Sequence, residues 1–273
     1  MGDMVRFMEF LTHEEKSQLT VEKYIRDARR FLCWLSGREL NKSQTLAYKA
    51  ELVEQYAVAS VNSMLSSVNA YLSFVGRGDC RVKIIKQQRQ AFLPEEKELT
   101  KEEYSRLIQA AQDKPRLCLL MQTICSTGIR VSEHRFITVE AARAGQAQVR
   151  LKGKSRTVFL PGKLCKALLK YAKKQGIQTG SVFVTSSGQP LNRCNIWAEM
   201  KKLCATAKVS REKVFPHNLR HLFARIYYGM ERDIVRLADI LGHSSINTTR
   251  IYTMESGKVH KQQIERMPLL IIT

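Results

Sequence analysis

The stretch Val214-Phe-Pro-His217-Asn-Leu-Arg220-His221 is followed by Leu241-Gly-His243 and then by Tyr252. His217 and Arg220 are three residues apart, so on a helix both side chains would project from one face. The glycine before His243 permits a tight turn at that point. This stretch therefore contains imidazoles, a guanidinium and a phenol that could bind an anionic group. Such a set of side chains is typical of half of an active site.

A second group of polar residues lies upstream, in Thr127-Gly-Ile-Arg130-Val-Ser-Glu133. Together the two stretches resemble the two signature boxes of the tyrosine recombinases, also called the phage-integrase and Xer family. Two separate boxes in this order are a specific signal, whereas a lone His-x-x-Arg would be weak. We expect Glu133 to orient the guanidinium of Arg130, and the alternative is an ordinary carboxylate on a helix surface.

The resemblance implies six catalytic positions, which are Arg130, Lys152, His217, Arg220, His243 and Tyr252. Arg130 and Arg220 would clamp the non-bridging oxygens of a phosphate and stabilise the charge that develops in the transition state. Tyr252 would attack the phosphorus and form a 3′-phosphotyrosine linkage. His217 would be its general base, because a phenol with a pKa of about 10 is mostly protonated at neutral pH. His243 would donate a hydrogen bond to the phosphate.

A β-hairpin with a basic tip is predicted between the two boxes. Residues 147–151 and 156–160 alternate apolar and polar side chains, and they flank Lys152-Gly-Lys154-Ser155. In the family, a lysine on this hairpin protonates the leaving 5′-oxygen, and it usually stands directly before a glycine, which favours Lys152. The loop is one residue shorter than the commonest pattern, so Lys154 stays open as the alternative. Otherwise Lys154 and Arg156 are predicted to bind DNA.

Three aromatic or imidazole residues near the second box receive structural interpretations. His221 is expected to pack or hydrogen-bond behind the site. Tyr227 and Tyr228 lie nearer to His217 than Tyr252 does, but they stand in a run with Ile226 that is typical of a core.

The net charge of the chain is +20, from 45 Lys and Arg against 25 Asp and Glu, and the sequence pI is about 9.8. Such an excess favours a polyanionic partner, although charge alone does not separate DNA, RNA and anionic membrane. The apolar run at residues 268–272 is far shorter than the roughly 20 residues of a membrane-spanning helix. The first ten residues include Asp3 and Glu9, so no secretory signal is predicted.

Neither a cofactor nor a metal ion is predicted. Asp233 and Asp239 are the only aspartates between Val214 and Tyr252, and neither is paired with another acid at the spacing of metal ligands. The seven cysteines form no Cys-x-x-Cys pair and are odd in number, which argues against zinc and against a disulfide framework. A reducing cytoplasm is therefore the expected location.

The predicted fold is mainly α with a small β-sheet, in two domains joined by a linker. Residues 1–93 resemble the SAM-like core-binding domain of the family, residues 94–99 form a polar linker, and residues 100–273 form the α/β tyrosine-recombinase catalytic domain. Hydrophobic periodicity predicts helices over 20–37 with Thr20 as N-cap, 43–56, 59–75, 115–126, 162–176 and 191–208. Thr100-Lys-Glu-Glu103 predicts a capping box at the start of another helix.

The predicted function is that of a site-specific recombinase, either Xer-like or the integrase of a mobile element. It would cleave and rejoin double-stranded DNA without a metal ion, and four protomers would bring two sites together. A type IB topoisomerase, which would act as a monomer, is the rival enzyme class, and a basic nucleoid or regulatory factor is the non-enzyme alternative. Residues 259–267 are expected to form a short helix, and the apolar tail 268–273 to dock on a neighbouring protomer or on its own domain.

Overall fold

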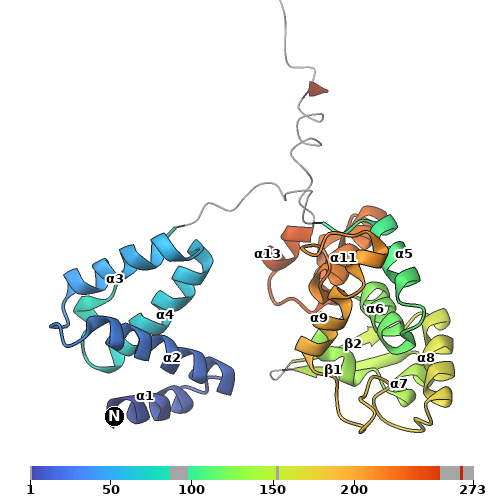
Figure 1. Cartoon of the computed structure of the whole chain (residues 1–273), viewed down its shortest axis with the longest axis horizontal. Coiled ribbons are helices and arrows are strands. Elements are labelled where there is room, and N and C mark those ends of the chain that lie inside the picture. Colours follow the sequence, from blue (N-terminus) through green and yellow to red (C-terminus); the bar gives the residue numbers. More distant parts are fainter. Residues whose placement is uncertain (1, 87–97, 152–153, 253–264, 267–273) are drawn as a thin grey trace, which may run out of the picture. The chain divides into compact units, whose positions relative to one another are not determined.

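The computed structural model describes residues 2–86, 98–151, 154–252 and 265–266 of the chain. They fall into two compact units, Met1–Arg89 and Gln90–Thr273, which are considered separately below (Figure 1). No helix in the described part of the chain is both long enough and apolar enough to cross a membrane.

The first unit is a bundle of helices. Its elements are α1 (Gly2–His13), α2 (Gln18–Leu35), α3 (Lys42–Gln55), α4 (Val58–Phe74) and the 3₁₀ turn η1 (Gly78–Cys80). The predicted helices over 20–37, 43–56 and 59–75 are confirmed as α2, α3 and α4. Apolar side chains such as Phe31, Leu65 and Leu72 are fully buried between them. The sequence pattern therefore identified the helices that enclose this core.

Two details of the first unit differ from the prediction. Thr20 is not the N-cap of α2, because the extended residue before the helix is Ser17 and the Thr20 hydroxyl lies 2.9 Å from the Ser17 hydroxyl, inside the first turn. Helix α1 was not predicted, although Phe7 and Leu11 stand four residues apart and bury the same face of it.

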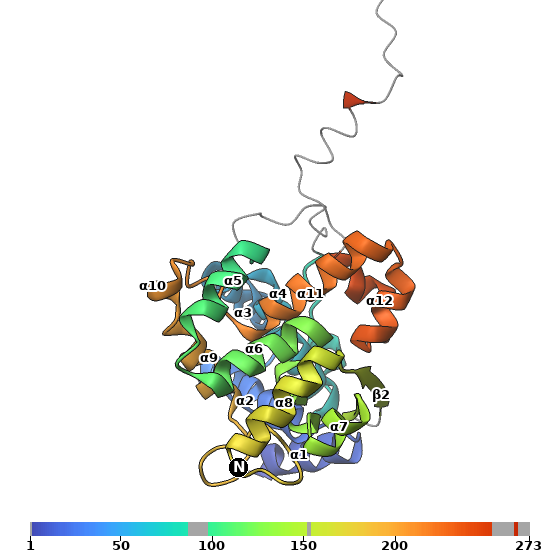
Figure 2. The ribbon, with the colours of Figure 1, turned by 90° about the vertical axis from the view of Figure 1, so that its right-hand side faces the viewer.

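The second unit surrounds a small antiparallel sheet with helices. In chain order its elements are α5 (Lys101–Ala110), α6 (Pro115–Thr127), η3 (Val131–Phe136), α7 (Val139–Ala144), β1 (Gln146–Leu151), β2 (Lys154–Phe159), α8 (Gly162–Lys174), α9 (Arg193–Lys201), α10 (Cys204–Ala207), α11 (Pro216–Glu231), α12 (Ile234–Leu241), α13 (Ile246–Thr249) and η4 (Arg250–Tyr252). The sheet pairs Gln146 with Phe159 at one end and Leu151 with Lys154 at the other. Helix α6 packs against both α11 and α8, and α6 and α8 lie side by side in Figure 2. The expected class, mainly α with a small sheet, is confirmed.

Helix ends in the second unit follow the predicted chemistry at one place and depart from it at another. The capping box of α5 is confirmed, since the Thr100 hydroxyl accepts the Glu103 amide at 3.1 Å and the Glu103 carboxylate accepts the Thr100 amide at 2.9 Å. The single helix predicted over 191–208 is divided into α9 and α10. An i to i−3 bond of 3.0 Å, from the Leu203 amide to the Met200 carbonyl, tightens the chain where they divide.

The second unit begins before residue 100. Leu99 is 1% exposed within its core, and the Leu99 carbonyl accepts a hydrogen bond of 2.6 Å from Arg225 of α11. Glu98 forms an ion pair with the same arginine. Residues 94–97 lie outside the described ranges, so the linker 94–99 stays a prediction for that part.

Candidate active site

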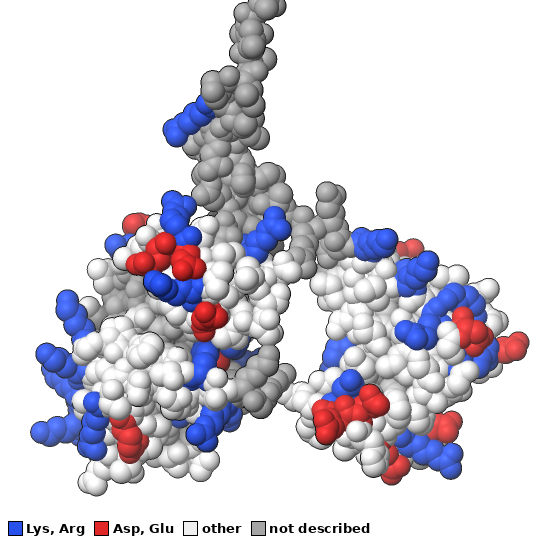
Figure 3. Space-filling model, turned by 180° about the vertical axis from the view of Figure 1, so that it is seen from behind, with Lys and Arg blue, Asp and Glu red and all other residues white. Residues whose placement is uncertain are grey.

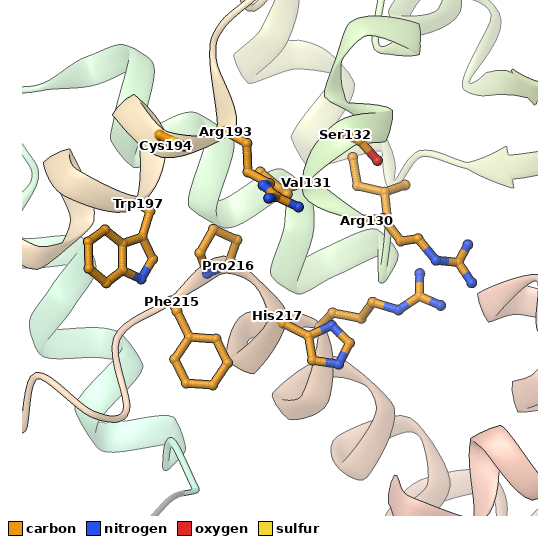
Figure 4. A pocket seen from close by; sticks show the side chains of 11 residues that line it. Arg130, Val131, Ser132, Arg193, Cys194, Trp197, Phe215, Pro216 and His217 are labelled. Atoms are coloured by element: carbon orange, nitrogen blue, oxygen red, sulfur yellow. The ribbon is translucent and has the colours of Figure 1, made fainter. Parts of the chain in front are cut away.

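Helix α11 presents His217 and Arg220 to one pocket. Pro216 occupies the first turn, where its missing amide costs nothing, and Phe215 enters the helix in an extended conformation. His217, Arg220 and Arg130 all line the same cavity of about 670 Å³ (Figure 4). The expectation that residues 217 and 220 share a helix face is confirmed.

Arg220 is part of the protein core. It is 1% exposed, and its Nη1 donates to the Gly128 carbonyl at 2.5 Å while its Nη2 donates to the Leu241 carbonyl at 2.7 Å. Gly128 caps the C-terminus of α6 and Leu241 ends α12. The carbonyls at helix C-termini lack intrahelical partners and carry partial negative charge, so two helix ends stabilise one guanidinium.

The charge of Arg220 survives this burial. Burial, and then the nearby charge of Arg130, lower the pKa of Arg220 to about 10, while Tyr252 acts in the opposite direction. A guanidinium with that pKa is still protonated at neutral pH. It can therefore neutralise an anion that enters the pocket.

Arg130 is held differently, by a side chain. Its Nη1 donates to Glu133 Oε1 at 3.1 Å, and its backbone amide donates to Glu133 Oε2 at 2.7 Å. Glu133 is 1% exposed, whereas the Arg130 side chain is 40% exposed and reaches the pocket. The predicted contact between Glu133 and Arg130 is confirmed, and Glu133 is a buried partner rather than a surface carboxylate.

His243 is neutral in this arrangement, and its tautomer follows from its partners. Its Nε2 lies 2.8 Å from Arg220 Nη2, which can only donate, so Nε2 accepts. The proton is therefore on Nδ1, which donates to the Thr249 hydroxyl at 2.9 Å. Burial and the charge of Arg220 lower the pKa of His243 to about 4.

Tyr252 is packed among the histidines. It is 3% exposed, and its ring stacks on His243 with centroids 5.7 Å apart and meets His221 edge-on at 4.5 Å. His221 in turn contacts His217 at 4.6 Å. The expectation that His221 packs behind the site is therefore confirmed.

Burial also keeps the other two imidazoles neutral. It lowers the pKa of His221 to about 3, and with the charges of Arg220 and Arg130 it lowers the pKa of His217. Tyr227 and Tyr228 are half-buried and pack against the apolar cluster that contains Tyr252, but Ile226 beside them is 42% exposed, so the run is only partly a core.

The hairpin is confirmed as β1 and β2, but its tip is not described. Lys152 lies outside the described residues, as do residues 253–264 and the tail 267–273, and the side chain of Lys154 is not described either. The choice between Lys152 and Lys154 therefore stays a prediction. Arg156, which the sequence analysis assigned to DNA, has its guanidinium 2.7 Å from Glu133, and its side chain is 14% exposed.

Further side chains that were not predicted also line the pocket. Cys194, Trp197 and Phe215 lie on the side away from Arg130, Arg193 lies between, and Ser132 lies beside Arg130 (Figure 4). Trp197 is 48% exposed, which is unusual for so large an aromatic side chain. The signal was present, because Arg193 and Trp197 stand four residues apart and share one face of α9.

The constellation is suited to phosphoryl transfer on a phosphodiester. Two guanidiniums can bind its non-bridging oxygens and a neutral imidazole can accept a proton. Tyr252 lies in ring contact with His221 and His243, and His221 in turn contacts His217. Within the described ranges, no three His, Cys, Asp or Glu side chains are grouped to hold a metal ion. This site, on a helical domain with one small hairpin, is of the tyrosine-recombinase class.

Comparison with known proteins gives the family. Residues 97–258 match the "Phage integrase family", and residues 4–77 match the "Phage integrase, N-terminal SAM-like domain". The chain belongs to the phage integrase family. Tyrosine recombinase XerA from Pyrococcus furiosus is 29% identical over 273 residues, which cover 97% of this chain and 93% of that protein.

Two solved structures share the fold. The XerH site-specific recombinase bound to difH substrate, in its pre-cleavage complex, has a TM-score of 0.71 at 19% identity, covering 91% of this chain and 80% of that one. A lambda integrase tetramer bound to a Holliday junction has a TM-score of 0.71 at 19% identity, covering 92% of this chain and 76% of that one.

Proposed function

We propose that this chain is a site-specific recombinase that cleaves and rejoins double-stranded DNA through a 3′-phosphotyrosine intermediate. The observation that carries the proposal is the contact of Tyr252 with His221 and His243 beside the buried, charged Arg220. The XerA relative bears the name tyrosine recombinase, and the XerH neighbour was solved bound to difH substrate in a pre-cleavage complex. Figure 3 shows Lys and Arg side chains spread over both units, which suits a polyanionic partner.

In the proposed reaction, the Tyr252 oxygen attacks the phosphorus and the bond to the 5′-oxygen breaks. Arg130 and Arg220 neutralise the charge that accumulates on the non-bridging oxygens. His217, which is neutral at pH 7 because its pKa is lowered, accepts the phenolic proton. Lys152 protonates the leaving 5′-oxygen. The reverse step, with a 5′-hydroxyl of another duplex, reseals the strand without ATP.

His243 must change its hydrogen bonding during this reaction. In the structure its Nε2 accepts from Arg220, so Nε2 cannot donate to a phosphate in this arrangement. An anionic phosphate would draw Arg220 toward itself and would raise the pKa of His243. Binding of DNA would thereby favour uptake of a proton from water at His243 Nε2, which could then donate to the phosphate.

The first unit would be the core-binding domain and the second the catalytic domain, with four protomers on two DNA sites. A lambda integrase tetramer on a Holliday junction has a similar fold, which supports that assembly. We expect the tail 268–273 to dock on the neighbouring protomer. Deleting it should then spare binding to a single site and impair synapsis in gel-shift and crosslinking assays, whereas unchanged synapsis would exclude docking in trans.

The cytoplasm is the proposed location. All seven cysteines are free thiols, which suits a reducing compartment. A fluorescent fusion that colocalises with DNA would agree with this location.

Replacement of the nucleophile tests the central step. Tyr252→Phe should still bind DNA but form no covalent adduct with a suicide substrate, while the wild type should form the adduct in EDTA. An adduct formed by Tyr252→Phe, or the loss of wild-type cleavage on chelation, would refute the mechanism.

The general acid can be identified with a substrate that has a sulfur at the 5′-bridging position, because a thiolate leaves without protonation. Lys152→Ala should slow cleavage of the normal substrate, and the sulfur substrate should restore much of the rate. Lys154→Ala should mainly weaken binding and reduce its salt dependence. Rescue of the Lys154 variant instead would reverse the assignment.

A topoisomerase of type IB would use the same chemistry without pairing sites. The relatives reported above are recombinases, which favours the recombinase. Synapsis of two sites with strand exchange would confirm that choice, and relaxation of supercoils by a monomer with no synapsis would contradict it. A binding-only factor would form no adduct at all.

A further inference from the structure

Arg156 lies on the buried side of the hairpin. Side chains on a strand alternate between its two faces, so Arg156 shares a face with Val158, and its register partner on β1 is Val149. Both valines are buried, with exposures of 4% and 3%. The guanidinium is therefore carried into the interior, and it meets Glu133 there at 2.7 Å.

Glu133 joins two arginines from different parts of the chain. Its Oε1 accepts from Arg130 Nη1 at 3.1 Å, and its Oε2 accepts from both Arg156 Nη2 and the Arg130 backbone amide, each at 2.7 Å. A carboxylate with partners on two sides can occupy few orientations. The direction in which Arg130 points therefore depends on where Arg156 holds Glu133.

Gly242 closes the other side of this group. A Cβ on Gly242 would lie 2.5 Å from Cδ and 2.6 Å from Nε of Arg156, so the turn packs against that side chain as closely as glycine permits. The Gly242 carbonyl also accepts from Arg130 Nη2 at 3.4 Å. The turn that carries His243 is thus in contact with both arginines.

Stability alone does not account for Arg156. Its Nε and Nη1 are buried without a hydrogen-bond partner among the described residues, and unpaired buried donors cost free energy. An apolar residue of similar size would suit the surrounding valines better. The guanidinium adds a positive charge near that of Arg130, and both arginines share the single carboxylate of Glu133.

We propose that Arg156 is a positioning residue, which fixes Glu133 and, through it, the phosphate-binding guanidinium of Arg130. It ties strand β2 to the segment that carries Arg130 and Glu133. This inference rests on the proposed recombinase function. It replaces the earlier assignment of Arg156 to direct DNA contact.

The test compares Arg156→Met with Arg156→Lys and with the control Arg150→Met. Arg150 is exposed on the same hairpin and is paired in register with Ser155. The measurements are single-turnover cleavage of a suicide substrate at saturating DNA, the dissociation constant as a function of salt, and the thermal midpoint.

We expect Arg156→Met to cleave about 100-fold more slowly at saturation, the scale of a misplacement near 1 Å. Its salt slope should stay unchanged, because no phosphate contact is lost, and Arg156→Lys should recover at least part of the rate. Arg150→Met should cleave at the normal rate. A salt slope that falls by about one for Arg156→Met, with normal cleavage at saturation, would restore the direct DNA contact and overturn the proposal.

A double-variant cycle with Glu133→Gln separates positioning from general loss of structure. Because Arg156 acts through Glu133, Arg156→Met should add little to the defect of Glu133→Gln, and independent effects would multiply instead. Multiplying effects would overturn the proposal, and if Arg156→Met fails to fold, Arg156→Lys takes its place in the cycle. A wild type that binds DNA but never forms an adduct would instead overturn the proposed function, and this inference with it.

Discussion

Arg220 and Arg130 reach the same pocket, but the regions that hold them differ in kind. Around Arg220 the partners are backbone carbonyls at the ends of α6 and α12, and the side chain is 1% exposed. Around Arg130 the main partner is the carboxylate of Glu133, and the side chain is 40% exposed. Backbone partners cannot be removed by substitution, so Arg220 is a part of the core, and the proposed function gives it the further role of binding phosphate. The orientation of Arg130 can be adjusted by other side chains.

The largest expected difference between the two regions is in the free energy of unfolding when each arginine is replaced by methionine. Arg220→Met leaves two carbonyls and His243 Nε2 without their donor, and each unpaired buried group costs about 1–3 kcal/mol. We expect the free energy of unfolding to fall by about 3 kcal/mol or more in denaturant titrations. Arg130→Met leaves Glu133 paired with Arg156 and should cost about 1 kcal/mol or less.

The cleavage rates of Arg220→Met and Arg130→Met should not differ in the way that their unfolding free energies do. Both variants should lose at least about 100-fold in cleavage rate, because each removes a donor to the transition state. Equal losses of stability would contradict the distinction between a core arginine and an adjustable one.

Two glycines offer a matched test of how closely the Arg220 region is packed. Gly128 and Gly145 both end helices with positive φ, at 66° and 71°. A Cβ on Gly128 would lie 2.5 Å from the Phe223 ring, and one on Gly145 would meet nothing within 4 Å. Gly145→Ala should cost about 1 kcal/mol in unfolding free energy from backbone strain alone. Gly128→Ala should cost about 1–3 kcal/mol more from overpacking.

Gly128→Ala should also slow cleavage, since the Gly128 carbonyl holds Arg220. Similar stability losses in the two glycine variants would show that α11 yields easily to the added methyl group. The Arg220 region would then be no more rigid than the Arg130 region.

The neutral histidines behind Tyr252 predict a pH dependence of stability. The pKa values of His221 and His243 are lowered from 6.5 to about 3 and about 4, so the unfolded chain binds protons at a pH where the folded chain does not. Falling pH therefore favours unfolding. We expect the unfolding free energy to be highest above pH 6.5 and to decline as the pH falls toward about 4.

Denaturant titrations at several pH values would measure this decline. His221→Gln should make it shallower, because one of the imidazoles that resist protonation is gone. If stability declined as steeply with falling pH in His221→Gln as in the wild type, His221 would not be one of the groups that cause the decline.

Local patterns in the sequence were enough to find the groups that stand close together in the chain. His217 and Arg220 on one helix face, and Thr100 with Glu103 in a capping box, each depend on a spacing of three residues. The location of Arg220 between two helix ends could not be predicted, because it depends on residues 92 and 21 positions away.

The sequence predicts a DNA contact for Arg156, and that contact stays a prediction. Its place two residues before Val158 also puts it on the apolar face of the strand, where the structure pairs it with Glu133. Trp197 was not predicted. Its four-residue spacing from Arg193 marks a helix face, but only the tertiary fold, in which α9 and α11 both contact α6, brings that face to the pocket that His217 and Arg220 line.

The smallest expected change is in DNA affinity, and it concerns the apolar end of the pocket, which lies across from Arg130 (Figure 4). Trp197 and Phe215 line this end. The ammonium of Lys201 lies over the Trp197 ring, with Nζ 5.0 Å from the ring centroid. An exposed ring beside a phosphate site can pack against the sugar or base of the neighbouring nucleotide. Trp197→Ala should therefore weaken DNA binding by about 1 kcal/mol, at the low end for one aromatic contact, which is roughly fivefold.

Salt titrations would show whether this contact is apolar, as the structure of the pocket indicates. The slope of log Kd against log salt should be the same for Trp197→Ala and wild type, because no cation is lost, whereas Arg193→Met should make it shallower by about one. Phe159→Ala is the control, since Phe159 is 75% exposed on β2 and does not line the pocket. If Trp197→Ala binds as tightly as wild type, the nucleotide lies only against the cationic end. Arg130 and Arg220 would then account for all of the DNA affinity that the pocket contributes.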